Sequence, residues 1–168
     1  CRNSRKILIV DSQLTKSNRR AAFLKGISFF VQSALLARPK FAGTLACRIV
    51  SAPPFEDDGS PICKSNIDLS AAVLAKDLER TLKRELPTER SKIDVEVAIK
   101  RDDPDRRLLH DRYWATDYSI VKLTRGFDFF TDKNSLYSQS IVLADAAEGV
   151  IASIQDLPDS ASPRHFHL

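Results

Sequence analysis

The chain has 168 residues, of which 43% are hydrophobic and 29% are charged, and it carries a formal net charge of +4. These values are typical of a soluble globular protein, and the length suits one domain with a sizeable core rather than two independent domains. The small excess of positive charge permits an anionic partner, such as nucleic acid or a lipid surface, without requiring one.

The first predicted elements are a buried strand and an amphipathic helix. The apolar run from Ile7 to Val10 precedes Asp11 and a polar turn, as in a strand of a parallel or mixed sheet. Apolar residues then recur at three- and four-residue steps until Pro39, and Thr15 or Ser17 is a candidate cap at the start. This spacing predicts a helix with one apolar face.

The middle of the chain predicts a strand, a loop, a helix and a strand. Residues 45–54 (LACRIVSAPP) form a strand pattern that two prolines stop, and residues 55–66 have the Asp, Gly, Pro and Ser content of a loop. A long helix with a charged outer face that ends before Pro87 is predicted by apolar residues at helical spacing, namely Leu69, Val73, Leu74, Leu78, Leu82 and Leu86. Residues 92–102 (KIDVEVAIKRD) alternate between apolar and polar, which predicts a third strand.

The last third predicts an antiparallel pair and a final strand and helix. The pair comprises residues 108–116 (LLHDRYWAT) and 118–130 (YSIVKLTRGFDFF). A short strand at 141–143 and a helix follow, and residues 157–168 are predicted to be a tail beyond a domain of residues 1–156. This order of elements predicts an α/β fold, a mixed sheet flanked by helices.

Cysteine usage and the lack of a leader favour a cytoplasmic protein. Cys1, Cys47 and Cys63 form no C-x-x-C pair and have no nearby histidines that would complete a zinc site. There is no run of 18 apolar residues and no signal-peptide pattern. Peripheral attachment to a membrane stays open. Because the sequence begins with cysteine and contains no methionine, we expect a domain of a longer chain.

His110, Arg112 and Asp117 form the main candidate site. If residues 109–116 are a strand, the period of two puts the side chains of His110 and Arg112 on one face. A guanidinium matches phosphate oxygens, and a neutral imidazole can attack phosphorus. Asp117 would join them only if the turn brought it back. The alternative is a structural histidine, with Arg112 paired to Asp111 or Asp117.

The spacing His110-x-Arg112-x4-Asp117, with Gly126 and FDF after it, resembles the HxKx4D signature of the phospholipase D superfamily and its following Gly/Ser-x-Asn element. The segments HDR and VKLTRGFDFF look closer still to the phospholipase D-like C-terminal domain of MIT-domain proteins and its bacterial relatives. The resemblance implies a phospholipase D-like fold and catalytic roles for the three motif residues. The candidate phosphate-binding residues are Arg112, Lys122, Arg125, Gly126 and Asp128.

The resemblance implies two functions that stay open. Superfamily enzymes need two motif copies, so this single-copy chain would act as a homodimer, with one histidine as nucleophile and its mate as general acid, and without metal or cofactor. In the MIT-domain relatives, the domain is a homodimer that binds phosphoinositide membranes rather than a hydrolase. Arg112 in place of lysine and Asp128 in place of asparagine depart from the enzymes. We therefore expect either a metal-independent phosphodiesterase or nuclease, or a non-catalytic module that binds phosphate groups of anionic lipid headgroups or nucleic acid, or part of a larger assembly.

Other candidate residues are weaker. His165 and His167 stand at alternate positions and could bind metal, but their place near a polar C-terminus favours a tail. Ser60 and Ser70 have no histidine at a plausible local spacing, and the five glycines form no phosphate-binding loop. A serine hydrolase or a P-loop protein therefore lacks support.

Overall fold

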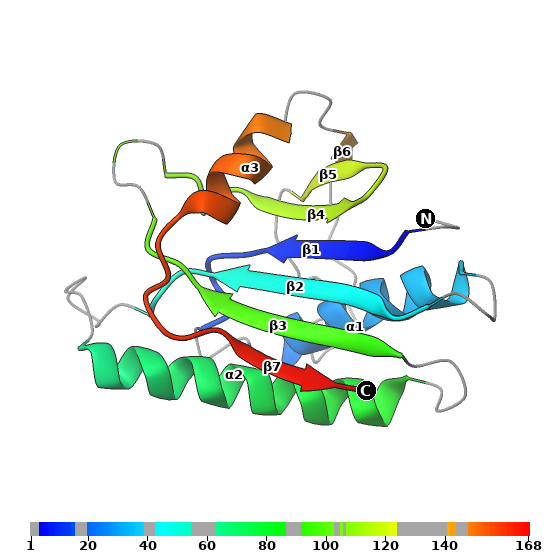
Figure 1. The fold of residues 1–168 in the computed structure, drawn as a ribbon, viewed down its shortest axis with the longest axis horizontal. Helices are drawn as coiled ribbons and strands as arrows, with labels where there is room; N and C mark the ends of the chain where they lie inside the picture. Colours follow the sequence, from blue (N-terminus) through cyan, green and yellow to red (C-terminus); the bar gives the residue numbers. More distant parts are fainter. Residues whose placement is uncertain are drawn as a thin grey trace.

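The computed structural model describes residues 4–15, 20–38, 43–54, 63–86, 92–102, 105, 107–123, 141–143 and 148–168. These residues form helices and a mixed open sheet with strand order β6-β5-β4-β1-β2-β3-β7 (Figure 1). The prediction of an α/β fold with a mixed sheet flanked by helices is confirmed.

The centre of the sheet is parallel. β1 (Lys6–Val10), β2 (Leu45–Ser51) and β3 (Ile93–Ile99) pair in chain order, joined by α1 (Arg20–Leu36) and α2 (Lys64–Glu85). Right-handed crossovers that step in one direction place successive helices on the same face of a sheet. Both helices accordingly pack their apolar sides on one face, where they cover the main core.

The antiparallel side of the sheet begins at β1. β4 (Arg112–Thr116) pairs with β1, β5 (Ile120–Leu123) pairs with β4, and β6 (Ile141–Leu143) pairs with β5. The predicted antiparallel pair and short strand are confirmed. The first strand of the pair is shorter than predicted, because residues 108–110 form a turn instead.

The C-terminal segment is part of the sheet, and the prediction of a tail is wrong. After α3 (Glu148–Asp156), β7 (Arg164–His167) pairs antiparallel with β3 at the edge of the sheet. Phe166 is buried in the main core, whereas its neighbours in β7 are exposed. One buried aromatic side chain in a polar four-residue strand is a weak sequence signal, although burial of every second residue marks a strand that has one covered face.

One helix boundary differs from the prediction: α2 begins at Lys64, so the predicted loop is wrong at residues 64–66. The hydroxyl of Thr15, a predicted cap of α1, donates to the carbonyl of Ala52 at 3.0 Å. Ser17, the other candidate cap, lies outside the described residues. None of the described helices has the length and apolar character to cross a lipid bilayer.

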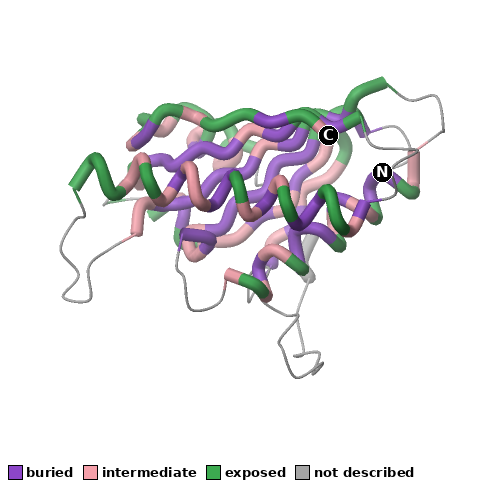
Figure 2. The backbone as a smooth tube through the Cα atoms, turned by 90° about the horizontal axis from the view of Figure 1, so that it is seen from below, coloured by how far each residue is buried: buried purple, intermediate pink, exposed green. Residues whose placement is uncertain are grey.

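The sheet has a core on each face. The larger core lies under α1 and α2, and the smaller one lies under α3 (Figure 2). Buried members of the smaller core are Leu8, Val10, Val50, Ala52, Leu109, Tyr113, Ala115 and Ile154. Both faces of β1 are therefore covered near its carboxyl end, which accounts for its continuous apolar run.

The side chain of Lys100, just after β3, binds the end of α3. Its buried amino group donates to the carbonyls of Gln155 at 2.9 Å and Leu157 at 2.5 Å, and it pairs with Asp159 at 3.3 Å. The last carbonyls of a helix have no partner within the helix, and a cation there is favourable. Lys100 therefore fixes α3 beside the edge where the parallel strands end.

Replacing this amino group should destabilise the fold. We expect Lys100→Met to lower the free energy of unfolding by on the order of 2 kcal/mol, because two carbonyls and the Asp159 carboxylate lose the buried amino group that they bind. The control is Lys83→Met, which removes an exposed pair with Glu79 and should change stability by less than about 1 kcal/mol. Urea denaturation measures both. Equal effects of the two substitutions would contradict an anchoring role for Lys100.

Candidate phosphate-binding site

The candidate site lies at the edge of the sheet where the parallel strands end. β4 runs antiparallel to β1, and Tyr113 pairs with Val10, so the start of β4 lies beside the end of β1. Ligands of open α/β sheets commonly bind beyond the carboxyl ends of the strands. Asp11 follows β1 at this edge, and His110 and Arg112 stand at the start of β4.

His110 lies in a turn that is held by hydrogen bonds and by its buried neighbour, rather than in a strand. Its backbone N–H donates to the carbonyl of Arg107 at 3.0 Å, and Arg107 adopts the left-handed conformation with φ 47°. Leu109 is fully buried in the smaller core, and its N–H donates to the carboxylate of Asp102 at 3.1 Å. The side chain of His110 is exposed. The strand period therefore does not set its position relative to Arg112, contrary to prediction.

Arg112 is held beside a buried carboxylate. Asp11 has an exposed fraction of 0%, accepts the N–H of Gln13 at 2.9 Å and lies 3.6 Å from Nε of Arg112. A buried carboxylate is costly unless nearby charge and hydrogen bonds compensate it. Arg112 supplies that charge while 25% of its own side chain stays exposed. The alternative prediction, a structural role in which Arg112 forms an ion pair, is correct about the ion pair. Its partner, however, is Asp11 rather than Asp111 or Asp117.

Asp117 does not lie with His110 and Arg112. It follows the far end of β4, where its carboxylate accepts the backbone N–H groups of Arg5 at 2.5 Å and Lys6 at 3.0 Å. Asp117 is five residue steps from Arg112 along β4, or about 16 Å at the usual rise per residue. The turn does not bring Asp117 back, and its contacts are those of a structural residue that joins the start of β1 to the end of β4.

Lys122 belongs to a polar cluster on the other face of the sheet. In the register of β4 and β5, Tyr113 pairs with Lys122, whereas Arg112 pairs with Leu123. Paired residues share a face, so Lys122 and Arg112 face opposite sides. The amino group of Lys122 binds the carboxylate of Asp111 at 2.7 Å, and the hydroxyl of Tyr113 donates to the same carboxylate at 3.2 Å. Arg125, Gly126 and Asp128 lie outside the described residues.

Ionisation in this cluster follows from its contacts. Burial alone would raise the pKa of Asp111, but the hydrogen bond and charge of Lys122, with help from Tyr113 and His110, lower that pKa below its ordinary value. Burial, together with the neighbouring Asp111 carboxylate, raises the pKa of Tyr113 to about 12. At neutral pH, Asp111 is therefore an ionised carboxylate whose charge is balanced by the ion pair with Lys122.

Two carboxylates of this edge were missed as site residues in the sequence. Asp11 was visible as the polar residue that ends a buried strand, which is the position where site residues of α/β sheets occur. Asp102 gave no such signal, because its contact with Leu109 depends on the turn between them. In the described part of the chain, no three His, Cys, Asp or Glu side chains are grouped so that they could hold a metal ion.

Comparison of the chain with models of protein families, with curated proteins and with solved structures found no match. The fold itself defines the class as α/β, with a mixed open sheet.

The pair of Lys122 and Asp111 makes a prediction about acid stability. Because the folded pKa of Asp111 is lowered, its contribution is fully present above the unfolded value, about 3.9, and is lost as pH falls through the lowered value. Both side chains are 41% exposed, so solvent screening limits the contribution to about 1 kcal/mol or less. We expect Lys122→Met to lower stability by this amount at neutral pH and to match the parent chain in strong acid.

The measurement is urea denaturation across a pH series. Asp111→Asn in the Lys122→Met background serves as the control, because it should add little once the cation is gone. A loss that is the same at neutral and at acid pH would contradict the pairing.

Proposed function

We propose that this domain is a phospholipase D-like module that binds phosphate or phosphodiester groups at the edge where β4 begins, through Arg112, which lies two residues after the exposed His110. The observation that carries the proposal is a partly exposed arginine side chain beside a buried carboxylate, two residues after an exposed histidine in a turn that hydrogen bonds hold in place. A guanidinium fork matches phosphate oxygens, and its charge-assisted hydrogen bonds are stronger than neutral ones.

Asp11 supports this function by orienting the arginine. Nε of Arg112 is buried and lies towards Asp11, so the exposed part of the side chain is elsewhere. An arginine whose stem is held in place loses less side-chain entropy on binding than a freely moving one. Asp11 would thus position Arg112 for the phosphate contact. In return, the charge of Arg112 compensates the buried Asp11 carboxylate.

Affinity for a phosphodiester tests the proposal. Arg112→Ala would remove the cation that lies beside the buried Asp11 carboxylate and endanger folding, so Arg112→Lys is the better variant. Lysine keeps the charge but lacks the fork, and we expect affinity to fall by about 1.5–3 kcal/mol, or roughly tenfold to a hundredfold. His110→Ala should leave affinity nearly unchanged, because a neutral imidazole holds an anion weakly.

The matched control is Arg48→Lys. Arg48 is also a partly buried arginine in an ion pair, with Glu96, but its side chain lies on the open face of the sheet rather than at the end of β1. Fluorescence anisotropy with a single-stranded oligonucleotide and cosedimentation with anionic vesicles distinguish the two sources of phosphate. If Arg48→Lys lowered the affinity as much as Arg112→Lys does, the binding would be a non-specific attraction to a basic chain. Unchanged affinity in Arg112→Lys would refute the site.

A second candidate function is hydrolysis of a phosphodiester by a dimer. It is favoured by the hydrogen bonds that fix the backbone at Leu109 and His110, because a nucleophile in a defined position saves much of the cost of orientation. Two copies of His110 would share the roles of nucleophile and general acid about a two-fold axis. Arg112 and its mate would offset the charge that develops on the phosphoryl oxygens.

The catalytic candidate predicts a dimer whose turnover depends on His110 and survives a chelator. We expect sedimentation to give a dimer, and His110→Ala to abolish hydrolysis of a phosphodiester with little loss of affinity. EDTA should leave turnover unchanged, because the chemistry would be carried by histidine. A monomer at all concentrations would remove this candidate. Hydrolysis that EDTA abolishes and magnesium restores would refute its mechanism.

A further inference from the structure

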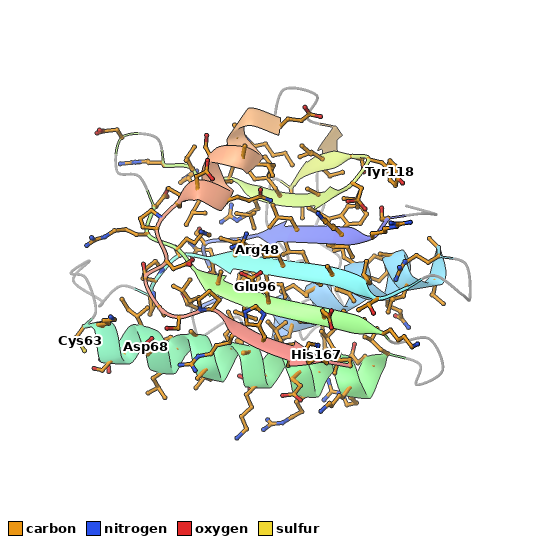
Figure 3. The ribbon with its side chains drawn as sticks, viewed as in Figure 1. Arg48, Cys63, Asp68, Glu96, Tyr118 and His167 are labelled. Carbon is orange, nitrogen blue, oxygen red and sulfur yellow. The ribbon has the colours of Figure 1, made fainter. Side chains whose placement is uncertain are left out.

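The open face of the sheet carries a groove that the proposed phosphate site does not use. α3 covers this face only towards the carboxyl ends of β1–β3, and beyond it lies a groove of about 580 Å³. The register places Arg48, Glu96 and His165 in one row across β2, β3 and β7, and Asp94 and His167 in the next row. Figure 3 shows Arg48 and Glu96 near the middle of this face and His167 farther along β7.

His165 and His167 project from the same face of β7. Phe166 between them is buried in the main core, so the period of two turns both imidazoles to the opposite, open side. Leu168 and Ile93 exchange both backbone hydrogen bonds, at 3.0 and 3.1 Å. In an antiparallel pair, hydrogen-bonded and non-hydrogen-bonded pairs alternate, and side chains approach most closely in the latter. His167 with Asp94, and His165 with Glu96, are both pairs of the close kind.

The two neighbouring carboxylates have different contacts. Asp94 lies 2.5 Å from Nδ1 of His167, so a Nδ1–H donated to Asp94 leaves the lone pair on Nε2. Glu96 forms an ion pair with Arg48 at 3.1 Å. A carboxylate on Nδ1 is the arrangement that commonly accompanies a histidine whose other nitrogen binds a metal, because it fixes the tautomer and the orientation of the ring.

We propose that His165 and His167 chelate one divalent late first-row transition metal ion, such as Zn²⁺, through their Nε2 atoms, with Asp94 positioning His167. Zn–N bonds of roughly 2.0–2.1 Å require the two nitrogens to approach within about 3.3 Å. Cα atoms two residues apart on a strand are separated by about 6.6 Å, which the side chains can bridge by rotation. Imidazole suits zinc, copper and nickel, whereas magnesium prefers oxygen ligands.

This chelate has two protein ligands, and water molecules would complete the coordination. It is therefore consistent with the finding that no three such side chains in the described residues form a metal group. The histidines line the groove near the amino ends of the parallel strands, whereas His110 and Arg112 stand at their carboxyl ends. The metal site and the phosphate site are therefore independent, and either can fail without the other.

Zinc titration by calorimetry tests the proposal in the chain carrying Cys1→Ser and Cys63→Ser, which removes the thiol of Cys1 and the exposed thiol of Cys63 as competing ligands. We expect one zinc ion per chain. His165→Ala and His167→Ala should each weaken binding by more than tenfold, because each breaks the chelate. Asp94→Ala should weaken it by about tenfold to a hundredfold, as is typical for the loss of a carboxylate that orients a metal-binding histidine. All three side chains are exposed, so circular dichroism should show that the variants keep the fold.

The control is His110→Ala, which removes the third of the three histidines in the chain and should bind zinc as its parent does. A second readout is thermal unfolding, which zinc but not magnesium should shift upwards, because the folded strand sets the spacing of the ligands. The absence of saturable zinc binding, or unchanged affinity in both His165→Ala and His167→Ala, would overturn the proposal. Unchanged affinity in Asp94→Ala would overturn the positioning role.

Discussion

The burial of the Asp11 carboxylate is the constraint on which the candidate phosphate site depends. Asp11 ends β1, the strand at which the parallel and antiparallel parts of the sheet meet. Its backbone N–H donates to Val50 at 3.0 Å, and the hydroxyl of Ser51 donates to its carbonyl at 2.8 Å, so the neighbouring strand holds its main chain. The side chain then requires a cation, and the first residue of β4 supplies one. Folding therefore places a guanidinium at the carboxyl edge of the sheet whether or not a ligand is bound.

This coupling gives a physical reason for an arginine rather than a lysine at position 112. A lysine has one charged nitrogen, and a contact with Asp11 would engage that same nitrogen. Arginine spreads its charge over three nitrogens, so that Nε can lie towards a buried carboxylate while the same planar group keeps other donors. The same coupling makes Arg112 both a residue that stabilises the fold and the proposed binding residue. Substitutions there change stability and affinity together, which is why a charge-conserving variant is needed to separate the two.

The sequence predicted the parts of the fold that depend on local patterns. Ile7 to Val10 and the alternating residues of β3 were recognisable because a strand buried on one or both faces has a regular apolar pattern. The turn before His110 was not predictable, because it depends on the burial of Leu109 in a core built by α3 and on the left-handed conformation of Arg107. The role of Asp117 was hidden for a similar reason: its partners, Arg5 and Lys6, are more than a hundred residues away in the chain.

The same distinction explains the histidines of β7. From composition alone, a polar C-terminal segment with two histidines is indistinguishable from a tail, because the edge strand exists only where β3 and the main core receive Phe166. Once Phe166 is buried, the strand period leaves both imidazoles on the open face, and the register brings Asp94 to one of them. Neither histidine is needed for the core, in contrast to Arg112, which compensates a buried charge. The two candidate sites therefore differ in kind: the phosphate site is tied to the stability of the fold, whereas the histidine pair can be changed without disturbing the core.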